Sequence, residues 1–264
     1  MKDYIIIILV SLGSSVVGGI CGIGGGVIIK PVLDAAGIIP VNTISFLSGC
    51  TVLSMSVISV FKHLTNSSAR TEFDKRIATA LAVGAVLGGF AGKSLYERIL
   101  QYMPSADKIG AIQAVVLLLI TAGTLLYTLN KNKITTLRVH KKFICVTIGM
   151  VLGLMSAFLG IGGGPINLVM LFFFFSLETK QAAVYSLYII MFSQTSSLLS
   201  SIVSNKIPEF SPFMIILMAC CGIGGGLVGS FIHQKARQET VDRLFIGLMS
   251  LIILINMYNI RKYI

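Results

Sequence analysis

The residues best suited to chemistry in this sequence are two glycine clusters, Gly22-Ile-Gly-Gly-Gly26 and Gly160-Ile-Gly-Gly-Gly164. Each glycine destabilises a helix by roughly 1 kcal/mol relative to alanine. Both clusters lie in apolar segments, and they predict a break in each helix. A helix that restarts after such a break presents amide groups with partial positive charge. Amides arranged in this way form a binding site for an anion.

Polar side chains near the two clusters could complete such a site. Pro165 suits the first turn of a restarting helix. Asn167 and Gln194 carry amides that need partners in an apolar setting. The helix after the first cluster, 44–62, and its counterpart 182–204 both have serine-rich faces. The predicted substrate-binding residues are Gly22, Gly24, Gly25, Gly26, Lys30, Ser45, Ser48, Gly160, Gly162, Gly163, Gly164, Pro165, Asn167, Ser186 and Gln194.

Two alternatives to this interpretation stay open. Glycines four residues apart, such as Gly22 and Gly26, also allow close packing between membrane helices. Lys30 is a functional candidate because it is a charge inside an apolar segment. Its position is equally consistent with pairing to Asp34 one turn on, or with extension to the membrane surface.

Other kinds of chemistry have little support in the sequence. The histidines His63, His140 and His233 have no metal-ligand spacing, and no Ser-His-Asp order or pair of buried carboxylates is present. These absences argue against an enzyme. The sequence implies no cofactor and no metal.

Composition indicates that these motifs lie in a membrane protein. Of the 264 residues, 55% are hydrophobic and only 12% are charged, about half the usual share of a soluble domain. A membrane-crossing helix needs about 20 apolar residues. The apolar segments are 4–36, 44–62, 77–99, 109–129, 143–176, 182–204, 210–232 and 242–260. The net charge of +11 then reflects basic loops rather than nucleic-acid binding.

The order of the segments predicts an internal duplication. Segments 4–36 and 143–176 carry the glycine clusters, and we call the spacing in sequence from Gly22 to Gly160 the cluster offset. Gly88-Gly89 with Gly92 correspond to Gly225-Gly226 with Gly229 at an offset that is shorter by one position. The fold class expected is therefore an all-α integral membrane protein of two four-segment repeats. The first repeat is 1–130, the basic connecting loop is 131–142 and the second repeat is 143–264. Such repeats are common in secondary transporters.

The orientation depends on whether segments 4–36 and 143–176 cross the membrane. If all eight segments cross, thirteen Lys and Arg lie on the side of the termini and eight on the other, which places both termini in the cytoplasm. If the two broken segments are hairpins, the same ratio places the termini outside. The pieces before the glycines are about 17 residues long, nearly a full span, which favours eight crossings.

The motifs resemble the TauE/SafE family of membrane transporters, also called sulfite exporter-like permeases. The resemblance rests on Gly22-Ile-Gly-Gly-Gly26 with Pro31-Val-Leu33, on the second glycine cluster and on the glycine-rich third and seventh segments. It implies a multi-pass protein of the bacterial cytoplasmic membrane that moves sulfite or organosulfonate anions. Lys30 stands where the family usually has an apolar residue, and Val169 stands where the second copy would have its later proline.

The function expected is export of a small anion across the lipid bilayer. Uptake of a sulfur compound or of another small organic anion is the alternative within transport. A non-transporting accessory membrane protein is the alternative from another class, although a scaffold has no need of paired glycine breaks. The sequence leaves a homo-oligomer open.

Overall fold

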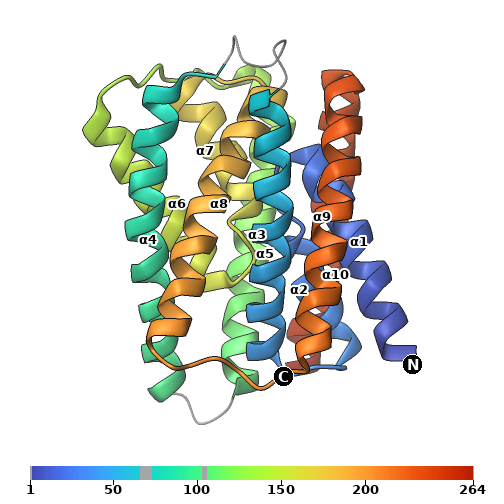
Figure 1. The fold of residues 1–264 in the computed structure, drawn as a ribbon. Coiled ribbons are helices and arrows are strands. Elements are labelled where there is room, and N and C mark those ends of the chain that lie inside the picture. The colour runs from blue at the N-terminus through green and yellow to red at the C-terminus, as the bar shows by residue number, and fades with distance from the viewer. Residues whose placement is uncertain (1, 66–72, 103–105, 264) are drawn as a thin grey trace.

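The computed structural model describes residues 2–65, 73–102 and 106–263, and every regular element within these ranges is helical. Eight of the described helices are long and apolar enough to cross a membrane, which confirms the predicted all-α membrane fold. They stand side by side as a bundle (Figure 1). They are α1 (Lys2–Cys21), α3 (Val41–Thr65), α4 (Lys75–Tyr102), α5 (Ala106–Asn130), α6 (Lys142–Leu159), α8 (Thr179–Val203), α9 (Pro212–Lys235) and α10 (Gln238–Tyr263).

Two short helices, α2 (Gly26–Ala36) and α7 (Gly164–Phe175), follow the glycine clusters. The helix before each cluster ends at Cys21 or at Leu159, so both predicted breaks are present. We call α1 with loop 22–25 and α2 the first hairpin, and α6 with loop 160–163 and α7 the second hairpin.

The first hairpin begins and ends at the same end of the bundle. Tyr4 on α1 contacts Phe213 at the start of α9, with 6.0 Å between ring centroids. At the end of α2, the Asp34 carbonyl accepts a hydrogen bond of 2.9 Å from Lys262 near the C-terminus. Both chain termini therefore lie together, as Figure 1 shows. We call this the terminal end.

The second hairpin begins and ends at the opposite end. The loop before α6 bonds to the end of α7, because the Leu137 amide donates to the Phe173 carbonyl at 2.7 Å. Lys131 after α5 forms an ion pair of 2.7 Å with Asp242 at the start of α10. We call this the basic end because many lysines and arginines lie there. They include Lys62, Lys75, Arg76, Lys131, Lys133, Lys141, Lys142, Lys180 and Lys235.

These contacts correct the preferred topology. The sequence favours a single crossing for each of 4–36 and 143–176, but each leaves and returns to one end of the bundle. α1 has 20 residues and is long enough to span, as expected. The glycine loop then reverses the chain, and α2 leads it back. The two hairpins enter from opposite ends, which is the inverted arrangement that was the alternative.

The two parts of the sequence interlock through glycines. A side chain at Gly88 of α4 would meet the Met150 carbonyl of α6, and one at Gly225 of α9 would lie 2.9 Å from the Leu12 carbonyl of α1. Leu12 and Met150 are themselves separated by the cluster offset. Each long glycine-rich helix thus packs on the hairpin from the other half. The internal duplication stays a prediction, and these paired contacts are what it would produce.

The side chains that face outward are apolar, as a bilayer requires. Leu9 of α1, Leu119 of α5, Ile216 of α9 and Leu254 of α10 are each more than 60% exposed. Many serines and threonines lie inside the bundle instead, and several donate to their own helix. Thr51, for example, donates to the Leu47 carbonyl at 2.9 Å.

Candidate anion site

The two glycine loops meet near the middle of the bundle. Gly24 and Gly162 have φ angles of +73° and +82°, a conformation that side chains with a Cβ rarely adopt. Both lie against Val52 of α3 and Ile190 of α8, which are themselves separated by the cluster offset. A Cβ at Gly162 would lie 2.7 Å from Val52 Cγ1. The backbone at both loops is therefore close-packed as well as left-handed.

The contacts of the outer glycines are reciprocal. A Cβ at Gly22 would meet Ala183 of α8, and one at Gly160 would lie 2.9 Å from the Cβ of Ser45 on α3. Ser45 and Ala183 are again related by the cluster offset. Each loop therefore rests on the helix that follows the hairpin of the other half.

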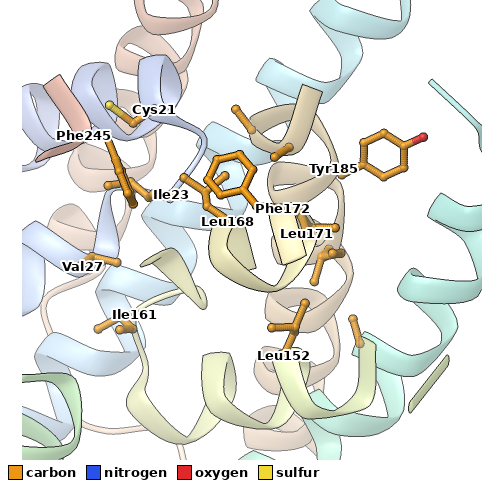
Figure 2. Close-up of a cluster of buried hydrophobic side chains, with 14 of the residues drawn as sticks. Cys21, Ile23, Val27, Leu152, Ile161, Leu168, Leu171, Phe172, Tyr185 and Phe245 are labelled. Carbon is orange, nitrogen blue, oxygen red and sulfur yellow. The ribbon is translucent and has the colours of Figure 1, made fainter. Parts of the chain in front are cut away.

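The half-helices begin against the opposite loop. Gly26 at the start of α2 faces the Ile161 carbonyl, and a Cβ at Gly164 would lie 3.3 Å from the Ile23 carbonyl. The first turns of α2 and α7 thus approach one region, as the anion hypothesis requires. That region is filled by apolar side chains, because Ile23, Val27 and Ile161 belong to the buried cluster drawn in Figure 2.

Several predicted site residues flank these helix starts. The Ser48 hydroxyl would lie 2.8 Å from a Cβ at Gly26, and it has no hydrogen-bond partner among the described residues. Asn167 Nδ2 donates to the Ser186 hydroxyl at 3.3 Å, while its Oδ1 has no partner in the part of the chain that the structure describes. Pro165 is buried in the first turn of α7. Buried polar groups without a partner are rare, so Ser48 and Asn167 are unusual among the side chains of this region.

Lys30 has a definite local role. It is only 5% exposed, so it does not reach the membrane surface. Its Nζ donates to Gln113 Oε1 of α5 at 2.5 Å and to the Leu159 carbonyl at 2.6 Å. Gln113 Nε2 donates to the Phe158 carbonyl at 2.6 Å. Lys30 and Gln113 therefore cap the C-terminus of α6, where the helix dipole favours a cation.

A polar cavity of about 20 Å³ lies beside this cap, between α3, α4, α5, α6 and α8. Three of the predicted site residues line it, namely Ser45, Gly160 and Gln194. Lys93 and Gln113 line it as well. The lining residues include no Asp or Glu, and their polar members are amides, hydroxyls and the ammonium of Lys93. Such a volume holds about one water molecule, so an oxyanion needs the surrounding helices to move apart.

Other contacts hold the cavity walls. Gln194 Nε2 donates to the Ser156 hydroxyl of α6 at 3.1 Å, which ties α8 to α6. The Lys93 ammonium lies 5.1 Å from the centre of the Tyr96 ring. The predicted site residues therefore fall into two groups: one lines the cavity, and the other flanks the starts of the half-helices.

Sequence reasoning missed Lys93 and Gln113, although a signal for both was available. Lys93 is a cation inside the apolar segment 77–99, directly after Gly92. The rule that selected Lys30 would have selected it too. Gln113 is an amide inside the segment 109–129, like Gln194 in its own segment.

Helices broken at membrane depth, inverted hairpins and a buried polar cavity define a polytopic membrane transporter. The family model for the sulfite exporter TauE/SafE matches residues 7–257, nearly the whole chain. The chain therefore belongs to the TauE/SafE family of membrane transporters, as its motifs indicated. No curated protein matches the chain. No solved structure matches it either.

Proposed function

We propose that the chain exports a small oxyanion, with sulfite or an organosulfonate as the leading substrate, from the bacterial cytoplasm. The observation that carries this proposal is the cavity lined by Lys93, Gln113 and Gln194, whose lining includes no carboxylate. Amide and ammonium groups donate hydrogen bonds to oxyanions, whereas a cation site needs acidic or carbonyl ligands. The sulfur chemistry rests on the description of the matching family.

The predicted helix starts supply a second part of the site. An anion that leaves the cavity past Gly160 meets the first turns of α2 and α7, with Ser48 and Asn167 beside them. These amides attract negative charge without a full positive charge to trap it. The occupied path would run from the cavity to the crossing of the two loops.

Transport needs the loops to separate from their packing partners. The inverted hairpins offer a way to do this, because each can rock against α3 or α8 while the other stays packed. Alternating access in transporters with inverted repeats follows this principle. The internal duplication, with repeats 1–130 and 143–264 around the loop 131–142, is part of this proposal.

The membrane orientation follows from the hairpins and the charges. With both hairpins returning to their own ends, twelve Lys and Arg of the described residues lie toward the basic end and eight toward the terminal end. The positive-inside rule then places the basic end in the cytoplasm and both termini outside. In this orientation the end of α8 that lines the cavity, at Ser201, faces the outside.

Flux into and out of liposomes tests the substrate. Purified protein is reconstituted, and the flux of labelled sulfite, sulfoacetate and acetate is measured in each direction. We expect protein-dependent flux of the sulfur oxyanions and slower flux of acetate. Flux of an amine or a metal cation that no oxyanion competes with would overturn the assignment.

A matched pair of lysine variants ties the flux to the cavity. Lys93→Ala removes the cavity cation, and we expect sulfite flux to fall at least about tenfold, the effect of roughly 1.4 kcal/mol. Lys75→Ala changes an exposed lysine of the same helix at the basic end and should leave flux unchanged. Equal flux in both variants would remove Lys93 from the site.

A further inference from the structure

Two buried histidines meet at the basic end, outside the site described above. His63 of α3 and His233 of α9 lie in an edge-to-face contact with 5.1 Å between ring centroids. They are 4% and 2% exposed. They come from different halves of the chain, so their contact joins α3 to α9 near the last turn of both helices.

The hydrogen bonds of the pair are incomplete. Neither ring nitrogen of His63 has a hydrogen-bond partner among the described residues. Nδ1 of His233 lies 2.6 Å from the Ile20 carbonyl of α1. Since a carbonyl only accepts, Nδ1 carries the proton and donates. A buried, unpaired imidazole is costly for the fold, and groups retained at such a cost are often functional.

Among the residues that the structure describes, the charged side chains that act on the pair are cations. Lys62 and Lys180 act on His63, and Lys180 also acts on His233. Lys62 Nζ donates to the Leu227 carbonyl of α9, and Lys180 Nζ donates to the Ala236 carbonyl, both at 3.1 Å. The neighbours that surround the pair therefore favour uncharged rings in the packed arrangement.

The position of the pair corresponds to the cavity at the other end. Two spacings identify equivalent positions in the two halves. The cluster offset relates positions in α3 to positions in α8. The spacing from Gly88 to Gly225 relates positions in α4 to positions in α9. His63 corresponds in this way to Ser201, and His233 corresponds to Tyr96. Ser201 and Tyr96 both line the cavity. At the basic end the same place is occupied by the two rings.

We propose that the His63–His233 contact is a proton-operated gate at the basic end of the transport path. Each imidazole takes up one proton from water at that end, with no other bond made or broken. Two protonated rings at this distance repel each other and need hydration, so they favour an arrangement with α3 and α9 apart. Release of the protons lets the rings pack and closes the path. The gate rests on the proposed transport function for its purpose.

Thiol labelling tests the gate without any substrate. Ser59 lies one turn before His63 and is fully buried, whereas Thr65 is exposed at the same end of α3. Ser59→Cys and Thr65→Cys are each labelled from the basic end with a membrane-impermeant maleimide, at about pH 8 and about pH 5.5, the range in which histidine titrates. The wild-type protein gives the background from its native cysteines. The ratio of the two rates cancels the effect of pH on the thiol.

We expect labelling of Ser59→Cys relative to Thr65→Cys to rise at least about fivefold at the lower pH, which corresponds to roughly 1 kcal/mol in the gate equilibrium. His63→Gln and His233→Gln should each abolish the rise. His140→Gln, which changes an exposed histidine of the connecting loop, should keep it. A ratio that does not change with pH in the protein with native histidines would overturn the gate, as would a rise that survives in both glutamine variants.

The same proteins in liposomes separate the two proposals. Absence of sulfite and sulfoacetate flux would contradict the proposed function, whereas the labelling ratio is independent of flux. Normal flux with no pH effect on labelling would retain the transporter and remove the gate.

Discussion

The two hairpins end their long helices in different ways. At the second hairpin the Phe158 and Leu159 carbonyls of α6 are capped by Gln113 and Lys30. At the first hairpin the Ile20 carbonyl of α1, which corresponds to that of Phe158 at the cluster offset, is capped by His233. One cap uses a lysine and a glutamine, and the other uses a histidine.

This difference indicates a division of roles between the two ends. A cap of lysine and glutamine ties α2 and α5 to the end of α6, beside the cavity. A histidine cap at the corresponding place of the basic end is the basis of the proton-operated gate that we propose. The two hairpins share one backbone plan but can have different roles. The second hairpin would form a wall of the binding cavity, and the first would form part of a gate.

The largest effect is expected from tests of the inverted arrangement itself, since the outcome is all-or-none. Alkaline phosphatase fused to the C-terminus should be active, and a fluorescent protein there should be dark, because we place the terminal end outside. Phosphatase inserted after Lys133, at the basic end, should be inactive. The reverse pattern in all three fusions would invert the proposed orientation.

Substitutions in the two loops should have the next largest effect. Gly24→Leu and Gly162→Leu introduce a side chain at positive φ, which costs about 1–2 kcal/mol before any clash with Val52 is counted. We expect sulfite flux to fall below detection in both variants while the protein still inserts. Gly123→Leu is the control, because Gly123 is exposed on α5 and has open space around it.

The outcome also sharpens the comparison between the hairpins. Equal loss in the two loop variants supports equivalent roles for the loops. Normal flux in both would show that the glycines serve packing alone and that the path lies elsewhere.

Removal of the α6 cap should have a moderate effect on stability. Lys30→Met and Gln113→Leu each leave a buried carbonyl without its donor, which should lower the free energy of unfolding by about 1–3 kcal/mol. Thermal unfolding in detergent measures the change. Because the two side chains bond to each other, the double variant should lose less than the sum of the single variants.

The control for the cap is Lys108→Met, which changes an exposed lysine of α5 and should stay within about 0.5 kcal/mol of the native protein. A Lys30→Met variant as stable as this control would contradict the capping role.

The smallest effect is expected at the ion pairs near the two ends. Lys131 and Asp242 are 2.7 Å apart at the basic end, and Lys206 and Glu97 are 3.3 Å apart at the terminal end. Both pairs are partly exposed to solvent, so Lys131→Ala and Lys206→Ala should each change stability by less than about 1 kcal/mol. A clearly larger loss in either variant, measured by thermal unfolding in detergent, would show that the pair stabilises its end of the bundle.

Several parts of the fold were predictable from the sequence. Long apolar segments predict membrane helices because the bilayer fixes both their length and their polarity. The glycine clusters predict the breaks because glycine weakens a helix wherever it occurs in a run. Pro165 at the start of α7 follows from its fixed φ and its missing amide proton. All three signals are local, so each can be interpreted without knowledge of the neighbouring helices.

The direction of the chain after each break was decided by tertiary structure. The pieces before the glycines are long enough to span, which favoured single crossings, but length does not say where the next half-helix goes. Contacts such as Asp34 with Lys262 return α2 to the terminal end. Such contacts join residues near opposite ends of the chain, and no periodicity in the sequence encodes them.

The candidate site shows the same division. Residue type marked Lys30, Ser45, Asn167 and Gln194 as polar groups in apolar segments, and all four lie inside the bundle or line its cavity. Sequence alone did not determine that Lys30 caps α6 or that Gln113 and Lys93 join the cavity wall. The sequence by itself determined which groups had to find partners, because burial of a polar group is costly. Tertiary packing decided which partner each one found, because that depends on which helices lie side by side.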